Sequence, residues 1–377
     1  MSYTPPQRPA LAPTATASEF LTTLGIIFAA IAVLLLVDSG LAEVDGTATR
    51  LHATSEYQVG ESLMAKGKLR ESIDHLRTAS TLDRGTSLYT VALAEAILAD
   101  GRPADAEPLL LPLLERNATD GATNLAMARI LAKEGRLEES KSYYHRAIYG
   151  LWSGDAERNR AAARFELIDL LAEHNQKQEL LAELLPIQDE APNDTVLRKR
   201  IAHLFVVAGS PARAAAIFRD VLRHNSRDAD AYVGLGDAAL ALGDYPSAQA
   251  DFASALRLSP DDSAIMARAK LADTVTAIDP TQRGLGLDEQ VRRSRNLLQM
   301  TIASARKCLG TDAPQVAAAL DSVTHGLVAS TGSVSRSQAI EETLAMAGQL
   351  WQMRGTKCAA APRSEEALAL VQDRIAR

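Results

Sequence analysis

The residues that most often carry chemistry are few and scattered in this chain. No histidine stands at a metal-ligand spacing from another histidine, a cysteine or a carboxylate, and the seven lie at positions 52, 75, 145, 174, 203, 224 and 325. Gly284 and Gly286 follow no strand, so they do not predict a phosphate-binding loop. Ser330 and Ser333 lack the motif that surrounds a hydrolase nucleophile. The sequence therefore predicts no catalytic, cofactor-binding or metal-binding residue, and we do not expect an enzyme.

The chain has two cysteines, Cys308 and Cys358, and both lie in its carboxy-terminal region. Apolar spacing predicts one helix that ends at Leu309 and another that ends near Arg354. If consecutive helices run antiparallel, these first and third helices point the same way and their carboxyl ends meet. We predict a disulfide between the two cysteines, worth about 4 kcal/mol, which requires an oxidising compartment. Two unrelated thiols are the alternative.

The elements that must position any site are clearest between Ala229 and Asp262. Apolar residues recur at helical spacing in both halves of this stretch, and Gly243 lies between the halves. Glycine allows the positive φ that closes the first helix, and Pro260 ends the second. The stretch therefore predicts one helical hairpin.

This hairpin resembles the tetratricopeptide repeat, a helix-turn-helix unit of about 34 residues. The residues that carry the resemblance are Tyr232, Leu235, Gly236, Gly243, Tyr245, Ala248, Phe252, Ala255 and Pro260. The resemblance implies that the hairpin stacks with others into a solenoid, because one hairpin cannot bury both of its apolar faces. It also implies a concave groove, lined by the first helix of each hairpin, that binds a protein or peptide.

The recurrence of the turn residue locates further copies of the hairpin. The turn glycine recurs at a spacing of 34 residues on either side of one longer gap, at Gly67, Gly101, Gly135, Gly209 and Gly243. The gap fits one more hairpin, with Asn175 at its turn and a six-residue insertion around Asp155 to Arg160. We predict six repeats, over residues 53–86, 87–120, 121–154, 161–194, 195–228 and 229–262. A helical bundle with accidental spacing is the alternative.

Columns of similar residues support this frame. Eight residues before the turn residue lie Val59, Leu93, Met127, Leu167, Ile201 and Leu235. Nine residues after it lie Leu76, Leu110, Tyr144, Leu184, Phe218 and Phe252. The residue after the first column is small, except at Ile168, and the small members are Gly60, Ala94, Ala128, Ala202 and Gly236. Small residues there predict a close approach of two helices.

The groove-facing residues of this frame carry both signs of charge and aromatic rings. They are Tyr57, Glu61, Glu95, Arg129, Phe165, Asp169, Lys199, His203 and Asp237. Some members of the family hold a peptide carboxylate with Lys and Asn at these positions, and this chain has neither in its first three repeats. We predict that these residues bind a protein or peptide partner. The alternatives are that they are merely solvated, or that residues 287–377 fill the groove by self-packing.

The amino-terminal region predicts a membrane anchor. Residues 1–19 are rich in Pro, Ala and Thr and predict a disordered tail. Residues 20–37 contain no charge and would make a helix close to the thickness of a bilayer, so we predict a transmembrane helix, followed by a linker over residues 38–52. A signal peptide cleaved after Ala42, which would give a secreted protein, and a buried core helix are the alternatives.

Charge around this segment predicts its orientation. Arg8 precedes the segment, whereas Asp38, Glu43 and Asp45 follow it with no basic residue before Arg50. The positive-inside rule then keeps the amino terminus in the cytoplasm and exports the repeats, which would be periplasmic in a bacterium.

The remainder of the chain predicts helices without a repeat. Residues 263–277 predict a capping helix on the last repeat, and residues 278–286 contain Pro and Gly and predict a linker. Residues 287–377 predict a small helical bundle, with helices over 287–309, 312–329, 335–354 and 364–376.

Composition limits the partners. The formal net charge is −7 and both signs are interspersed, so we expect no nucleic acid, and no small-molecule substrate or cofactor is indicated. The sequence predicts an all-α protein, a tetratricopeptide-type solenoid with one transmembrane helix. We interpret it as a membrane-anchored scaffold for protein–protein interactions outside the cytoplasm, in a bacterial envelope or secretion-type assembly. A structural subunit whose groove is filled by self-packing, or a carboxy-terminal bundle with enzymatic activity, are the alternatives.

Overall fold

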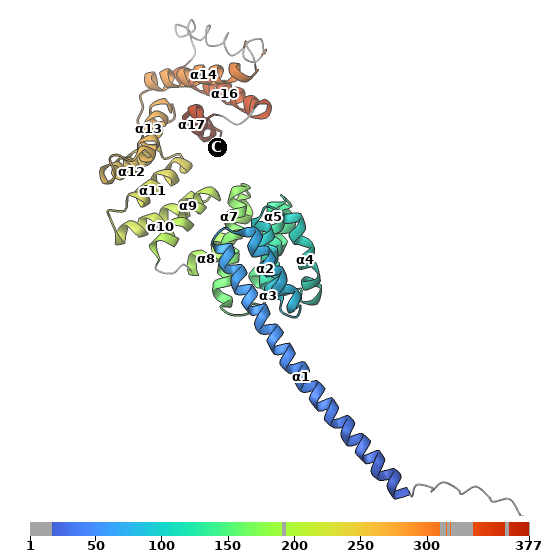
Figure 1. Cartoon of the computed structure of the whole chain (residues 1–377). Coiled ribbons are helices and arrows are strands. Elements are labelled where there is room, and N and C mark those ends of the chain that lie inside the picture. The colour runs from blue at the N-terminus through green and yellow to red at the C-terminus, as the bar shows by residue number, and fades with distance from the viewer. Residues whose placement is uncertain are drawn as a thin grey trace, which may run out of the picture. The chain divides into compact units, whose positions relative to one another are not determined.

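The computed structural model describes residues 17–190, 194–309, 335–358 and 362–376, together with positions 314 and 317, apart from a number of side chains in α1 and a few elsewhere (Figure 1). The chain divides into two compact units, one up to Leu167 and the other from Ile168. Within the described ranges the regular structure is helical, and the one extended pairing is an isolated bridge between Asp120 and Leu151. The all-α prediction is therefore confirmed.

The helices follow one another along the chain in two groups, one in each unit. The first unit contains α1 (Ala17–Ala65), α2 (Leu69–Leu82), α3 (Ser87–Ala99), α4 (Pro103–Arg116), α5 (Gly121–Lys133), α6 (Leu137–Tyr149) and most of α7 (Ala156–Glu173). The second contains α8 (Lys177–Glu190), α9 (Thr195–Val207), α10 (Pro211–His224), α11 (Ala229–Leu242), α12 (Tyr245–Leu258), α13 (Ser263–Ile278), α14 (Leu287–Leu309), α16 (Arg336–Lys357) and α17 (Glu366–Ile375).

The turn residue of every predicted hairpin has a positive φ. Five are glycines, with φ between 73° and 81°, and Asn175, at 55°, is the one residue other than glycine with a positive φ in the described part of the chain. The residue after each turn residue donates its backbone N–H to a carbonyl five positions back, as Asp244 does to Ala239 at 2.9 Å. This left-handed closure ends the first helix of each hairpin next to the turn residue that the sequence identifies.

Asn175 gives a test of the turn chemistry. Replacing it by alanine is expected to lower the free energy of unfolding by about 1 kcal/mol, because a Cβ without a polar group is strained at this φ. Asn175→Gly is the control and should match or exceed the wild type. Guanidinium titration followed by circular dichroism measures both, and equal stability of the two variants would contradict the assignment.

The predicted insertion lengthens one helix instead of forming a loop. Helix α7 has 18 residues, whereas α3, α5 and α9 each have 13, and its extra turn lies at its start. Trp152 lies just before it and donates its Nε1–H to the carbonyl of Ala147 at 2.9 Å. A Cβ on Gly121 would lie 2.4 Å from the Trp152 ring, so the ring fills the space that a missing side chain leaves.

The apolar columns of the sequence form the core of each hairpin. Leu93, Met127 and Ile201 are at most 4% exposed, and the Phe218 and Phe252 side chains are fully buried. A Cβ on Gly60 would lie 2.6 Å from Leu76, and one on Gly236 2.6 Å from Phe252, which confirms the predicted close approach. Val59 departs from its column with 40% exposure, because it lies on α1 and no earlier hairpin stands before it in the series.

Helix α1 continues through residues 38–52, where the sequence predicts a linker. This segment has no proline, and its two glycines weaken a helix without ending it. The predicted tail lies outside the described residues up to residue 16, and residues 17–19 begin α1. A membrane-spanning helix, one both long and apolar enough, is not found among the described residues. Within the predicted anchor, the structure does not describe the side chains at positions 20, 21, 23, 34, 36 and 37.

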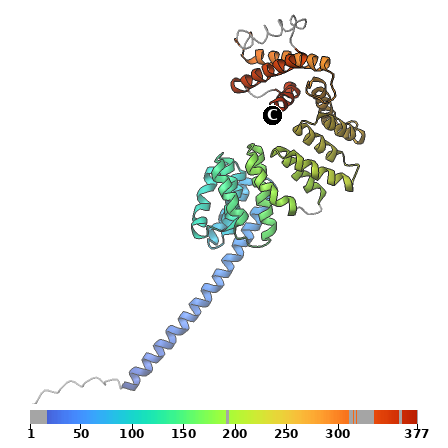
Figure 2. The same ribbon diagram turned by 180° about the vertical axis from the view of Figure 1, so that it is seen from behind.

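The carboxy-terminal helices of the second unit follow the sequence closely. Helix α13 caps the last hairpin over Ser263–Ile278, and α14 spans Leu287–Leu309 as predicted. Ser335 accepts a hydrogen bond from the Gln338 backbone N–H at 3.2 Å and so begins α16. Helices α14 and α16 lie side by side (Figures 1 and 2), and the helix predicted over 312–329 lies outside the described residues apart from positions 314 and 317.

Candidate partner-binding faces

The predicted site residues lie on the first helices of the hairpins, on one face of each. On α3 this face carries Leu88, Val91 and Glu95, which are spaced as residues on one side of a helix. On α9 it carries Val196, Lys199 and His203 at the same spacing. We call this side of the first helices the groove face, and each unit has its own.

Arg129 joins three hairpins on the groove face of the first unit. Its Nε and Nη2 donate to the two carboxylate oxygens of Glu166 at 2.8 and 2.6 Å, and its Nη1 donates to Glu95. Burial raises the pKa of Glu95, and the charge and hydrogen bond of Arg129 act in the opposite direction. The hydrogen bond to Glu166 raises the pKa of Arg129, so the guanidinium is a fixed positive charge. The cluster holds α3, α5 and α7 in register.

The same face begins with Tyr57, which packs on the buried Tyr89. The ring of Tyr57 packs on that of Tyr89 with 5.3 Å between centroids, and Tyr89 shares a hydrogen bond of 3.0 Å with Thr54. Burial raises the pKa of Tyr57, and the charges of Glu61 and Glu95 raise it further. Glu61 itself is exposed. This end of the face therefore combines aromatic surface with an accessible carboxylate.

Ion pairs also link neighbouring first helices in the second unit. Arg200 donates to both oxygens of Asp169 at 2.7 and 2.6 Å, and Arg268 pairs with Asp237. Lys199 lies 3.1 Å from Asp228 and 3.0 Å from Asp230.

His203 shares one of these carboxylates. Its Nε2 lies 3.5 Å from Asp230, and its ring stacks edge-on against Phe218 at 4.8 Å. Hydrogen bonds from His203 and Lys199 hold the pKa of Asp230 well below its ordinary value, against the effect of burial.

Three of these partners, Glu166, Arg200 and Arg268, were not predicted from the sequence, and in the structure they follow a regular spacing. Asp169 pairs with a residue 31 positions later, as does Asp237, and Arg129 pairs with Glu166, 37 positions later. The last spacing equals 31 plus the six-residue insertion, so all three pairs follow one rule. The structure brings Glu95 together with Arg129, and Lys199 with His203 through Asp230, whereas Asp169 and Asp237 pair with residues outside the predicted set.

Exposed apolar side chains on the groove faces were also missed. Leu88 is 50% exposed and lies two turns before Glu95 on α3, and Val196 is 74% exposed and lies one turn before Lys199 on α9. Both stand three residues before a residue of the groove face, so helical spacing from Val91 and Lys199 could have found them.

The carboxy-terminal helix covers the end of the second unit's groove face. Ala367, Leu368 and Val371 of α17 belong to one buried cluster with residues of α11, α12 and α13. Tyr245 donates its hydroxyl to the carbonyl of Leu370 at 2.8 Å. Burial raises the pKa of Asp237, and Glu366 of α17 adds to this through its negative charge. Self-packing by the carboxy-terminal region therefore occurs at the last hairpin.

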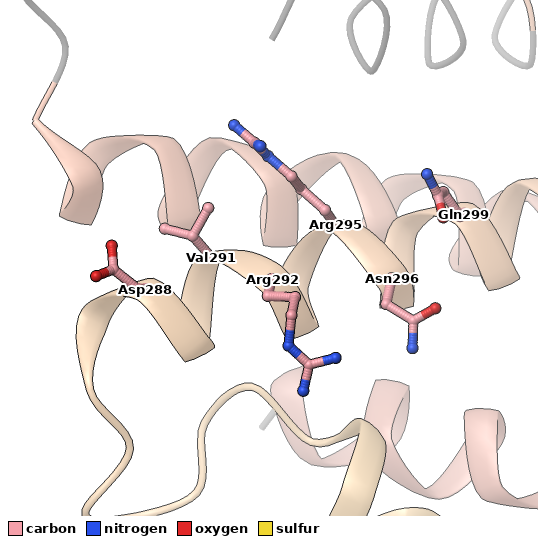
Figure 3. A pocket seen from close by; sticks show the side chains of 6 residues that line it. All are labelled: Asp288, Val291, Arg292, Arg295, Asn296 and Gln299. Carbon is pink, nitrogen blue, oxygen red and sulfur yellow. The ribbon is translucent and has the colours of Figure 1, made fainter. Parts of the chain in front are cut away.

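An open cavity of about 490 Å³ lies along α14 (Figure 3). It is lined by Asp288, Val291, Arg292, Arg295, Asn296 and Gln299. The guanidinium of Arg292 donates to Glu289, and Asp288 pairs with Arg336 at 3.3 Å. All six side chains come from one helix, so the cavity does not assemble groups from different elements. Within the described ranges, no group of three His, Cys, Asp or Glu residues is placed to hold a metal ion.

Asp230 makes the stability of the second unit depend on pH. Its folded pKa lies below the unfolded one, so its pairing stabilises the chain above about pH 4 and is lost as the pH falls further. Asp230→Asn is expected to cost less than about 1 kcal/mol at pH 5.5, since the side chain is 55% exposed. Stability measured at pH 5.5 and at pH 3 should show the difference shrinking at the lower pH. A difference independent of pH would contradict the ion pairing.

Comparisons with known proteins agree with the hairpin frame. Residues 199–263 match the tetratricopeptide repeat family. The chain is 23% identical over 255 residues to DnaJ homolog subfamily C member 3 of Rattus norvegicus, which aligns 63% of this chain with 49% of that protein. The chain thus spans about half the length of this curated relative.

Solved structures similar to this chain are also tetratricopeptide repeat proteins. YrrB, described as a TPR protein with an unusual peptide-binding site, is 17% identical, with 52% of this chain and 97% of that chain covered and a TM-score of 0.41. The carboxy-terminal part of a TPR repeat-containing protein from Cytophaga hutchinsonii is 12% identical, with 70% and 99% covered and a TM-score of 0.47. The family match over residues 199–263 confirms the predicted resemblance to the tetratricopeptide repeat.

Proposed function

We propose that this chain of tetratricopeptide repeats is a membrane-anchored scaffold that holds a protein or peptide partner on its groove faces outside the cytoplasm. Such a scaffold would serve a bacterial envelope or secretion-type assembly. The observation that carries the proposal is the exposure of Leu88 and Val196 on helix faces that also carry ordered charged side chains. An apolar side chain that stays in solvent next to fixed polar groups is what the anchor residue of a peptide needs.

The ion pairs of the groove faces support this role. Arg129 and Glu166 are each about one third exposed, so both remain within reach of a partner while they fix one another in place. A partner then meets side chains that are already ordered, which reduces the entropy cost of binding. Tetratricopeptide repeats generally act as scaffolds without catalysis, and this arrangement suits such a role.

The anchor is proposed from the amino-terminal part of α1. Residues 20–37 contain no charge, and the described apolar side chains among them are exposed, with Ile26 at 67%, Phe28 at 65% and Leu35 at 64%. A bilayer would cover this surface. The acidic flank after the segment favours export of the repeats, and a disulfide suits an oxidising compartment.

Site-specific photo-cross-linking tests the partner site. A photoreactive amino acid placed at Leu88 or Val196 of the membrane-bound protein should form a discrete adduct with a partner. Leu111 on α4 and Leu185 on α8, which are 44% and 39% exposed on second helices, are the matched controls and should form none. Adducts from the controls alone would move the site to the opposite side of the hairpins.

Reporter fusions at Arg377 test the proposed location. A reporter that is active only after export should be active, and one that works only in the cytoplasm should not. The reverse pattern overturns the orientation. The mass of the purified chain separates an anchor from a signal peptide cleaved after Ala42, because cleavage removes residues 1–42.

A further inference from the structure

The disulfide of this chain lies at the junction of three helices in the second unit. Cys308 is near the end of α14, and Cys358 is the residue that caps α16, with 6.0 Å between their Cα atoms. Cys308 is exposed and Cys358 is half-buried, so a small reductant can reach the bond.

One turn before each cysteine stands a buried polar residue. Ser304 lies four residues before Cys308, and Arg354 lies four residues before Cys358. The Arg354 Nε donates to the Ser304 Oγ at 2.7 Å, and both side chains are at most 8% exposed. The relative position of these two groups therefore depends on the two helix ends that the disulfide joins.

Both polar residues converge on Glu365. The Ser304 hydroxyl donates to Glu365 Oε2 at 2.5 Å, the Arg354 Nη2 donates to the same atom at 3.4 Å, and Lys307 lies 3.0 Å from Oε1. Glu365 is 9% exposed and is the residue immediately before α17. Leaving a buried carboxylate without such partners costs folding free energy. The ends of α14 and α16 therefore fix the position of Glu365.

Helix α17 depends on this attachment and on its docking surface. It has ten residues, which is too short for a stable helix on its own. Leu368 and Val371 pack into the buried cluster of the last hairpin, and Arg374 pairs with the buried Asp279 at 2.8 Å. Removing the attachment at Glu365 leaves the docking contacts alone to hold the helix.

We infer that the Cys308–Cys358 disulfide is a redox latch that keeps α17 docked on the last hairpin. A dithiol reductant opens it: the S–S bond breaks, the cysteines gain two electrons and two protons as thiols, and the reductant becomes its own disulfide. The ends of α14 and α16 then separate, Glu365 loses its fixed partners and α17 undocks from the last hairpin. The apolar surface around Tyr245 is uncovered. The undocking of α17 also opens the groove face at Asp237 to a partner, and this last step rests on the proposed function.

Hydrogen exchange of the full chain in detergent, read by mass spectrometry, tests the latch without any partner. On reduction with dithiothreitol, the amides of Glu366–Ile375 should exchange at least tenfold faster, and those of α9 and α10 should not change. Equally slow exchange in α17 after both thiols have been alkylated would overturn the inference. So would a loss of protection that extends through α9 and α10, because the disulfide would then be a general staple.

A variant that keeps the cysteines provides the second test. Glu365→Gln should speed exchange in α17 at least fivefold in the oxidised protein, because the amide cannot take the charge-assisted bonds from Ser304 and Lys307. Glu366→Gln, at the exposed neighbouring residue, is the control for the loss of one negative charge in the first turn, and it should change the exchange clearly less. Identical exchange in both variants would contradict the route through Glu365. Failure of cross-linking at Leu88 and Val196 would reject the proposed function and leave these results unaffected.

Discussion

Replacing Phe252 by alanine is expected to lower the free energy of unfolding of the second unit by about 3–5 kcal/mol. The ring is fully buried, and it lies so close to α11 that a Cβ on Gly236 would stand 2.6 Å from it. The α11 backbone at Gly236 packs against the ring, and the turn at Gly243 connects α11 directly to the helix that carries the ring. The space that alanine leaves cannot close, so the loss includes a cavity as well as buried apolar surface.

Two further variants make the Phe252 result interpretable. Phe252→Leu retains most of the apolar volume and should cost clearly less than the alanine variant. Leu242→Ala removes a side chain that is 48% exposed on the same hairpin and should change stability by less than about 0.5 kcal/mol. Guanidinium titration measures all three. A loss below about 1 kcal/mol for Phe252→Ala would show that the ring does not fill a rigid site between the helices.

The hairpins could be predicted because their determinants are local. A residue that tolerates positive φ must stand at each turn, and Asn175 could be identified from the period although it is not a glycine. The buried columns follow from the same period. Apolar spacing predicts the carboxyl ends of α14 and α16, and a capping serine marks the start of α16. Cys308 and Cys358 meet because the two helices point the same way.

The contacts between hairpins could not be predicted in the same way. Whether Arg129 reaches Glu166 depends on how far α7 is shifted along α5, and the period of a single hairpin does not contain that offset. Residues 38–52 form a helix and not the predicted linker, because nothing in this segment breaks a helix. The sequence there carries no other signal that separates a helix from a connecting segment. Docking of α17 depends on Glu365, a charged residue whose burial has no signature in the sequence.

Replacing Arg129 by methionine is expected to lower the free energy of unfolding of the first unit by about 2 kcal/mol at pH 7.5. Glu95 and Glu166 would then face one another without a cation, in positions that are 29% and 33% exposed. Breaking a fully buried pair costs about 3–5 kcal/mol, and partial exposure reduces that value here. Methionine preserves most of the aliphatic volume of the arginine, so the loss reports mainly on the charge.

The pH dependence of this loss identifies its cause. Burial already raises the pKa of Glu95 above its ordinary value, and removal of the guanidinium raises it further. The ionised carboxylate is the costly form, so the loss should be greatest above the raised pKa and should shrink as the pH falls toward 4.5. Arg129→Lys keeps a positive charge without the two-pronged bond to Glu166 and should lie between the wild type and Arg129→Met. An equal loss of stability at pH 7.5 and pH 4.5 would show that packing causes the effect. The ion pairs would then not be what holds the groove face in register.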